Sequence, residues 1–208
     1  MRIHPKYIQI IGDAVIPLLG FFVWSWNIYF ILLFYLLDLL VKEVVMHFKS
    51  NRIVKFQSEI GLINTSSKNE LKFRFLSSIL LIFSLFVIHF ALVVKDNNFN
   101  LLKELIDFWN YKDMGFAQGY ILIPLVIVMG FMQYKNEFIL PKLYENQSLD
   151  IIWKKHIKAL IVLLSFSSLT FGILQFVKIN DLILVIGVIG ISSAYQFFEI
   201  RSQFTNKK

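Results

Sequence analysis

The sequence predicts an all-α polytopic membrane protein: a bundle of six transmembrane helices with a short amphipathic helix at its outer surface. Hydrophobic residues make up 57% of the 208 positions and charged residues 17%, whereas soluble domains carry about a quarter charged residues. The apolar residues form uninterrupted blocks, each long enough to cross about 30 Å of hydrocarbon at about 1.5 Å per residue. Lys and Arg collect in alternate connections between these blocks. One integral membrane domain therefore accounts for residues 1–208.

The apolar blocks set the expected helices. Residues 7–24, 27–48, 73–94, 115–134, 157–177 and 182–199 are the six predicted spans. The turn Trp24-Ser25-Trp26-Asn27 places two indoles at a membrane interface, where Trp is favoured. Ser67-Lys-Asn-Glu70 has the pattern of a capping box at the start of the third span.

Residues 99–109 form an amphipathic segment between the third and fourth spans. One helical face is polar, and the other is apolar and carries Leu101, Leu102, Leu105, Ile106 and Trp109. Such a pattern predicts a short helix lying in the outer interface, with a cap over the outer mouth of the bundle as the alternative.

The basic residues predict the orientation of the helices. Of the 21 Lys and Arg residues, 16 lie in the termini and in the second and fourth connections: Arg2, Lys6, Lys49, Arg52, Lys55, Lys68, Lys72, Arg74, Lys135, Lys142, Lys154, Lys155, Lys158, Arg201, Lys207 and Lys208. The opposite side holds Lys95, Lys103, Lys112 and Lys178. By the positive-inside rule, both termini are cytoplasmic, and we expect a multi-pass protein of the bacterial inner (cytoplasmic) membrane.

Composition excludes several kinds of site. The net charge of +7 comes from basic residues that lie beside the membrane on one side. We therefore expect no nucleic-acid partner. The chain has no cysteine, and its four histidines share no metal-ligand spacing, so neither a metal nor a cofactor is expected. Residues 153–158 form a basic, aromatic cluster beside the membrane, which anionic head groups explain. Signatures of zinc proteases, serine hydrolases and P-loop enzymes are absent, so we do not expect an enzyme.

The first predicted hairpin carries a candidate site. Residues equally distant from a tight turn lie at equal depth, which pairs Asp13 with Asp38 and Gln9 with Lys42. Asp38 lies 12 residues beyond Trp26, roughly 18 Å below the outer interface. Ionisable groups at that depth must pair. One lysine shared by two carboxylates favours a proton-exchanging site, and a salt bridge that locks the hairpin is the equal alternative.

Two further features complete the predictions from helix spacing. Small residues form stripes in the last two spans, which match in depth and predict close helix packing: Ser165, Ser168 and Gly172 with Gly187, Gly190 and Ala194. Glu43 and His47, four residues apart, lie nearer the cytoplasmic face, and we expect them to be interfacial.

The N-terminal fifth of the chain resembles a known family. Pro17-Leu18-Leu19-Gly20, then Trp26, then Tyr35-Leu36-Leu37-Asp38 are similar to the opening of an uncharacterised prokaryotic family of small polytopic membrane proteins. That family tends to have Asn where this chain has Asp13, and Trp and Glu where it has Leu36 and Asp38. The resemblance implies a bundle of similar size and an acid at position 38, and it implies no activity.

Two functions agree with these features. We expect a non-catalytic integral membrane subunit, a scaffold or accessory factor of a larger membrane complex. Its partners would be the lipid bilayer and either other membrane subunits or further copies of the chain, with the 22 Phe residues supplying the contact surfaces. The alternative is a small proton-coupled transporter or channel-like protein that uses Asp13, Asp38 and Lys42.

Overall fold

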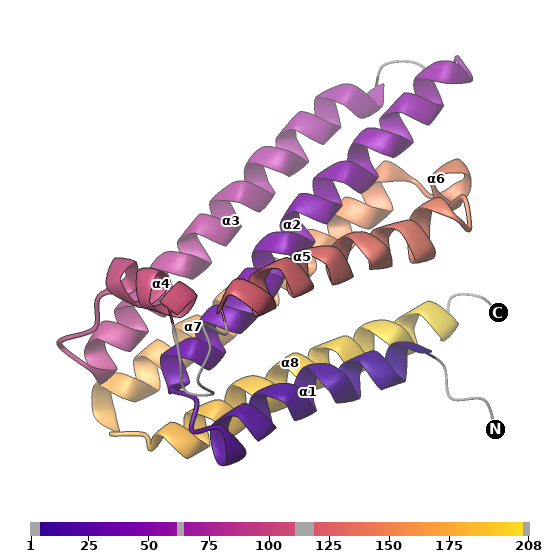
Figure 1. Cartoon of the computed structure of the whole chain (residues 1–208). Coiled ribbons are helices and arrows are strands. Elements are labelled where there is room, and N and C mark those ends of the chain that lie inside the picture. Colours follow the sequence, from indigo (N-terminus) through magenta and orange to yellow (C-terminus); the bar gives the residue numbers. More distant parts are fainter. Residues whose placement is uncertain (1–4, 62–64, 111–118, 206–208) are drawn as a thin grey trace.

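A computed structural model describes residues 5–61, 65–110 and 119–205, and every element in these ranges is helical (Figure 1). The elements are α1 (Pro5–Val23), α2 (Ile28–Glu59), α3 (Thr65–Lys95), α4 (Leu101–Asn110), α5 (Gly119–Tyr134), the π-helical turn η1 (Lys135–Ile139), α6 (Leu143–Asn146), α7 (Leu149–Phe176) and α8 (Asp181–Thr205). The predicted all-α class is therefore confirmed.

The helices lie roughly along one long axis, so the bundle has two ends (Figure 1). At the α6 end lie the first residues of α1, the last residues of α8, the end of α2, the start of α3 and α6 itself. At the α4 end lie the α1–α2 turn, α4 and the α7–α8 connection. Most of the described Lys and Arg residues lie at the α6 end of the bundle. Lys95, Lys103 and Lys178 lie at the α4 end.

Three helix pairs build the bundle. The most extensive contact is between α3 and α7, α5 packs along α2, and α8 packs along α1 (Figure 1). Ile31 is fully buried in an apolar core at the α4 end, which also contains Phe30, Phe108 and Val185. A second core at the α6 end surrounds the fully buried Trp153. Apolar packing therefore holds each end of the bundle separately.

Several helices extend beyond the predicted apolar spans. α2 continues to Glu59, and α3 already begins at Thr65. These extensions contain polar helix-forming residues and no Pro or Gly, so the helix does not end where hydrophobicity ends. The predicted capping box is wrong for the same reason: Glu70 lies inside α3, where its carboxylate accepts a hydrogen bond from Ser50 of α2 at 2.6 Å.

Two described helices are long and apolar enough to cross a membrane. They are residues Asn69–Lys95 of α3 and Leu149–Phe176 of α7. α2 is longer, but Asp38, Lys42 and Glu43 interrupt its apolar part. α5 has 16 residues.

The structure does not place the two predicted small-residue stripes against each other. An added Cβ at Gly172, Gly187 or Gly190 would meet no atom within 4 Å. Instead, α7 lies along α3, and α8 lies along α1. The number of residues from the turn determines how far a residue lies from it, but not the direction in which its side chain faces around the helix axis. Ser165 and Ser168 are exposed, and the side chain of Ala194 lies outside the described residues.

The α1–α2 turn depends on a glycine. The Trp26 amide donates to the Gly20 carbonyl at 2.8 Å, which folds the indole back over α1. The Asn27 side chain then caps α2 by accepting from the Tyr29 amide at 3.1 Å. A Cβ at Gly20 would overlap the Trp26 ring, which is itself buried. The Gly of the Pro-Leu-Leu-Gly element therefore has a packing role.

We expect Gly20→Ala to lower the free energy of unfolding by about 2 kcal/mol, because the added methyl group displaces the buried indole. The measurement is denaturant unfolding in detergent micelles. Gly12→Ala is the matched control, since a Cβ there meets no atom within 4 Å and alanine favours the helix by up to about 1 kcal/mol. Equal effects of the two substitutions would contradict this role of Gly20.

Candidate functional site

The Asp38–Lys42 half of the predicted cluster forms within α2. Lys42 Nζ lies 2.5 Å from Asp38 Oδ2, one helical turn away. The Asp38 side chain is 33% exposed and the Lys42 side chain is 44% exposed. Gln9 and Asp13 lie in α1, but their side chains are outside the described residues. The structure therefore shows the Asp38–Lys42 pair. The full cluster, with Gln9 and Asp13, stays a prediction.

A second cluster of ionisable groups centres on Glu43, the residue that follows Lys42 in α2. Its carboxylate is buried and contacts side chains from three helices. Ser77 of α3 donates to Glu43 Oε1 at 2.6 Å, and His156 Nε2 of α7 lies 2.5 Å from Oε2. His47 Nε2, from α2 itself, lies 3.3 Å from Oε1. We call these four residues the Glu43 cluster.

Burial raises the energetic cost of losing any of these contacts. Glu43 is 7% exposed and Ser77 is fully buried. An ionised carboxylate removed from water is costly unless charged or hydrogen-bonding partners surround it. Both carboxylate oxygens have such partners, and each partner that comes from α3 or α7 fixes the position of its helix against α2.

A polar layer next to the Glu43 cluster joins the same three helices. Ser50 of α2 donates to Glu70 of α3, and Trp153 Nε1 of α7 donates to Ser50 Oγ at 3.2 Å. Arg74 donates to Glu70 and to the Asn51 side chain. We call this layer the Ser50 cluster. It lies nearer the α6 end, since Ser50 follows Glu43 along α2.

The sequence pattern did not predict this meeting of α2, α3 and α7. Glu43 and His47 have helical i,i+4 spacing, but His156 is separated from Glu43 by 113 residues. Ser50 and Ser77 are uncharged residues within predicted helices, and nothing in the neighbouring sequence marks them as partners of a carboxylate. Serines within an apolar helix are the sequence feature that could have indicated this site. Their hydroxyl groups form hydrogen bonds between helices where no water is present.

The geometry limits the chemistry of the Glu43 cluster. Ser77 donates to a carboxylate rather than to an imidazole, so the proton relay that activates a nucleophilic serine is not formed. Within the described residues, no group of three His, Cys, Asp or Glu side chains is arranged to hold a metal ion. A carboxylate between two imidazoles can fix the helices that carry these side chains.

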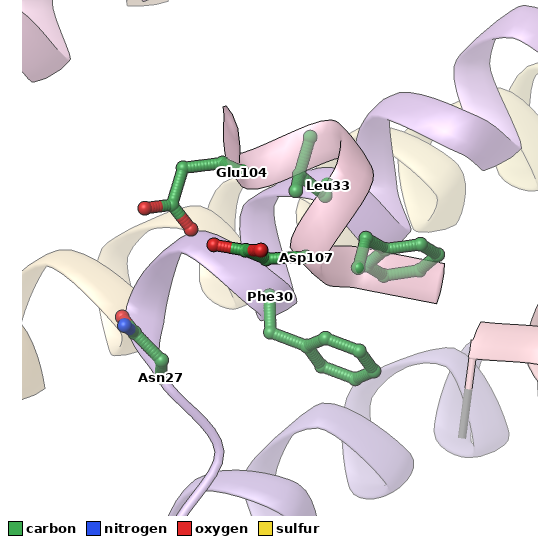
Figure 2. Close-up of a pocket in the computed structure, with 6 residues that line it drawn as sticks. Asn27, Phe30, Leu33, Glu104 and Asp107 are labelled. Atoms are coloured by element: carbon green, nitrogen blue, oxygen red, sulfur yellow. The ribbon is translucent and has the colours of Figure 1, made fainter. Parts of the chain in front are cut away.

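A shallow pocket lies at the α4 end, between α2 and α4 (Figure 2). Phe30 and Leu33 of α2 line it together with the N-cap residue Asn27, and Glu104, Asp107 and Phe108 line it from α4. Burial and the neighbouring Asp107 carboxylate raise the pKa of Glu104. The acidic side of α4 therefore faces the bundle.

The apolar side of α4 faces outward. Phe108 anchors the helix on Phe30, with ring centroids 4.6 Å apart. Leu102 and Ile106 are 72% and 63% exposed. A helix at residues 101–110 is thus confirmed, and its outward apolar face is the one that the sequence analysis assigned to an interface.

Comparisons with protein-family models, with curated proteins and with solved structures find no match to this chain. The family resemblance of its N-terminal fifth stays a prediction. The geometry of the described residues therefore carries the functional argument.

We expect His156→Ala to lower the free energy of unfolding by about 3 kcal/mol, because it leaves the buried Glu43 carboxylate without its α7 partner. Denaturant unfolding in detergent micelles measures this loss. Gln175→Ala, at an exposed position of the same helix, should change stability by less than about 0.5 kcal/mol. Indistinguishable results for the two variants would refute the role of His156.

Proposed function

We propose that this chain is a six-span integral membrane protein that serves as a non-catalytic subunit, a scaffold or accessory factor, of a larger membrane complex. The observation that carries the proposal is a continuous apolar stripe along α3. Its members recur every three or four residues and are 44% to 72% exposed: Leu71, Phe75, Ile79, Ile82, Phe86 and Phe90. No Asp, Glu, Lys or Arg lies between Arg74 and Lys95.

An apolar surface of this length is expected to be shielded from water by lipid or by another protein. Soluble monomers rarely expose contiguous apolar patches of more than a few hundred Å². α5, α7 and α8 also carry exposed apolar side chains along their lengths, including Leu125, Met129, Leu169, Ile173 and Ile183. A lipid bilayer covers all these faces at once, and a partner helix covers part of them. The basic connections at the α6 end support a cytoplasmic location of that end.

The interior supports a structural role rather than catalysis. Within the Glu43 cluster and within the Ser50 cluster, buried polar groups of different helices form hydrogen bonds with each other. The pocket between α2 and α4 is shallow and lies at the opposite end from the Ser50 cluster. The features that face outward are apolar surfaces, which is the chemistry of a protein that holds other membrane-embedded chains.

The membrane location can be tested with introduced cysteines, because the chain has none of its own. We expect Lys142→Cys, at the α6 end, to react with a membrane-impermeant maleimide in inside-out vesicles and not in right-side-out vesicles. Lys178→Cys, at the α4 end, should show the reverse. Labelling of both positions from one side, or release of the chain by alkaline carbonate, would contradict the proposed topology.

Purification in a mild detergent tests the scaffold role. We expect a second membrane protein at a fixed stoichiometry, measured by native mass spectrometry. An isolated homo-oligomer would count against the scaffold.

A proton-coupled transporter is the second candidate, favoured by the partly exposed Asp38–Lys42 pair in the apolar part of α2. It predicts pH-dependent flux in reconstituted vesicles, which Asp38→Asn abolishes. Unchanged flux in that variant would eliminate the role of Asp38.

A further inference from the structure

α7 carries a row of lysines on the side that faces away from the bundle. Lys154, Lys155 and Lys158 are exposed. The same two turns direct Trp153 into the core and His156 toward Glu43. Because the inward positions are fixed by buried contacts, the helical repeat holds the three lysines outward.

Lys72 of α3 lies at the same level as these lysines. α3 and α7 run in the same direction, and the Phe73 ring stacks on the Trp153 ring with centroids 6.3 Å apart and an interplanar angle of 12°. Residues next to Phe73 in α3 are therefore level with residues next to Trp153 in α7. Lys72 is also exposed. We call Lys72, Lys154, Lys155 and Lys158 the lysine surface.

Two helix lengths place this level at the edge of the hydrocarbon. A span takes about 20 residues. Counted back from the last residue of α3, Lys95, about 20 residues reach Leu76. Counted back from the last residue of α7, Phe176, they reach Ile157. Both counts end beside the lysine surface, although they start from different helices.

Exposed apolar side chains lie on both sides of the lysines. Leu71 and Ile151 are 72% and 58% exposed on the α6 side, and Ile161 is 48% exposed on the other side. The flanking favours the head-group layer, where lysine ammonium groups meet phosphates while their alkyl chains contact lipid. The neighbouring acid of α3, Glu70, is already bound by Ser50 and Arg74.

We propose that the lysine surface binds the phosphate groups of anionic phospholipids in the leaflet at the α6 end. The inference rests on the proposed membrane location and adds a lipid preference to it. Four cations within about two helical turns, with apolar flanks, fit the phosphates of the head-group layer. An acidic soluble partner would instead meet Leu71 and Ile151, which offer it no polar contact.

The test uses the full chain reconstituted in phosphatidylcholine vesicles that contain spin-labelled phosphatidylglycerol or spin-labelled phosphatidylcholine. Electron paramagnetic resonance separates the lipid held at the protein surface from bulk lipid. We expect wild-type protein to prefer phosphatidylglycerol. Lys154→Gln/Lys158→Gln should reduce this preference by up to about fivefold for each lysine removed, and added salt should reduce it in the wild type.

The matched control is Lys103→Gln/Lys178→Gln, which removes two charges at the α4 end and should keep the preference. Circular dichroism and the total amount of held lipid verify that each variant is folded and inserted. If the wild type holds no lipid at all, the membrane location itself fails. If it holds lipid without preference for phosphatidylglycerol, or if both double variants lose the preference equally, the lysine surface alone is refuted.

Discussion

One buried carboxylate sets the geometry of the bundle. Glu43 contacts Ser77 of α3 and His156 of α7 through its two oxygens, so three helices must keep one rotation and one depth to satisfy it. Apolar side chains alone would tolerate rotation or sliding, because one hydrophobic contact resembles another. A buried carboxylate does not, since losing a partner leaves a desolvated charge. The Ser50 cluster repeats this constraint one layer away.

The outward surfaces follow from this constraint. With Ser77 turned inward, the helical repeat turns Phe75, Ile79 and Phe86 outward along α3. With His156 and Trp153 turned inward, Lys154 and Lys158 face outward on α7. The proposed lipid-facing stripe and the proposed lysine surface thus have the same origin as the polar interior. α1 and α8 are joined to this unit by apolar packing around Ile31, and α8 also by the ion pair between Lys95 of α3 and Asp181 of α8.

Local signals predicted most of the helices, because each depends on residues close in sequence: apolar runs, the turn at Trp24–Asn27 and the amphipathic segment that became α4. The Asp38–Lys42 pair was equally local. The Glu43 cluster was not, since it requires knowing which faces of α2, α3 and α7 meet. Turn positions in the sequence constrain how far each residue lies from the turn, but they do not set the rotation of a helix about its axis. The small-residue stripes of α7 and α8 failed to meet for that reason.

The most direct test of the central role of Glu43 is a double-mutant cycle between Glu43→Leu and His156→Leu, measured as the free energy of unfolding in detergent micelles. If the carboxylate and the imidazole hold α2 and α7 together, the two substitutions are strongly non-additive, with a coupling of about 2 kcal/mol or more. Additive effects within about 0.5 kcal/mol would contradict the account, because they would mean that the two side chains stabilise the bundle independently.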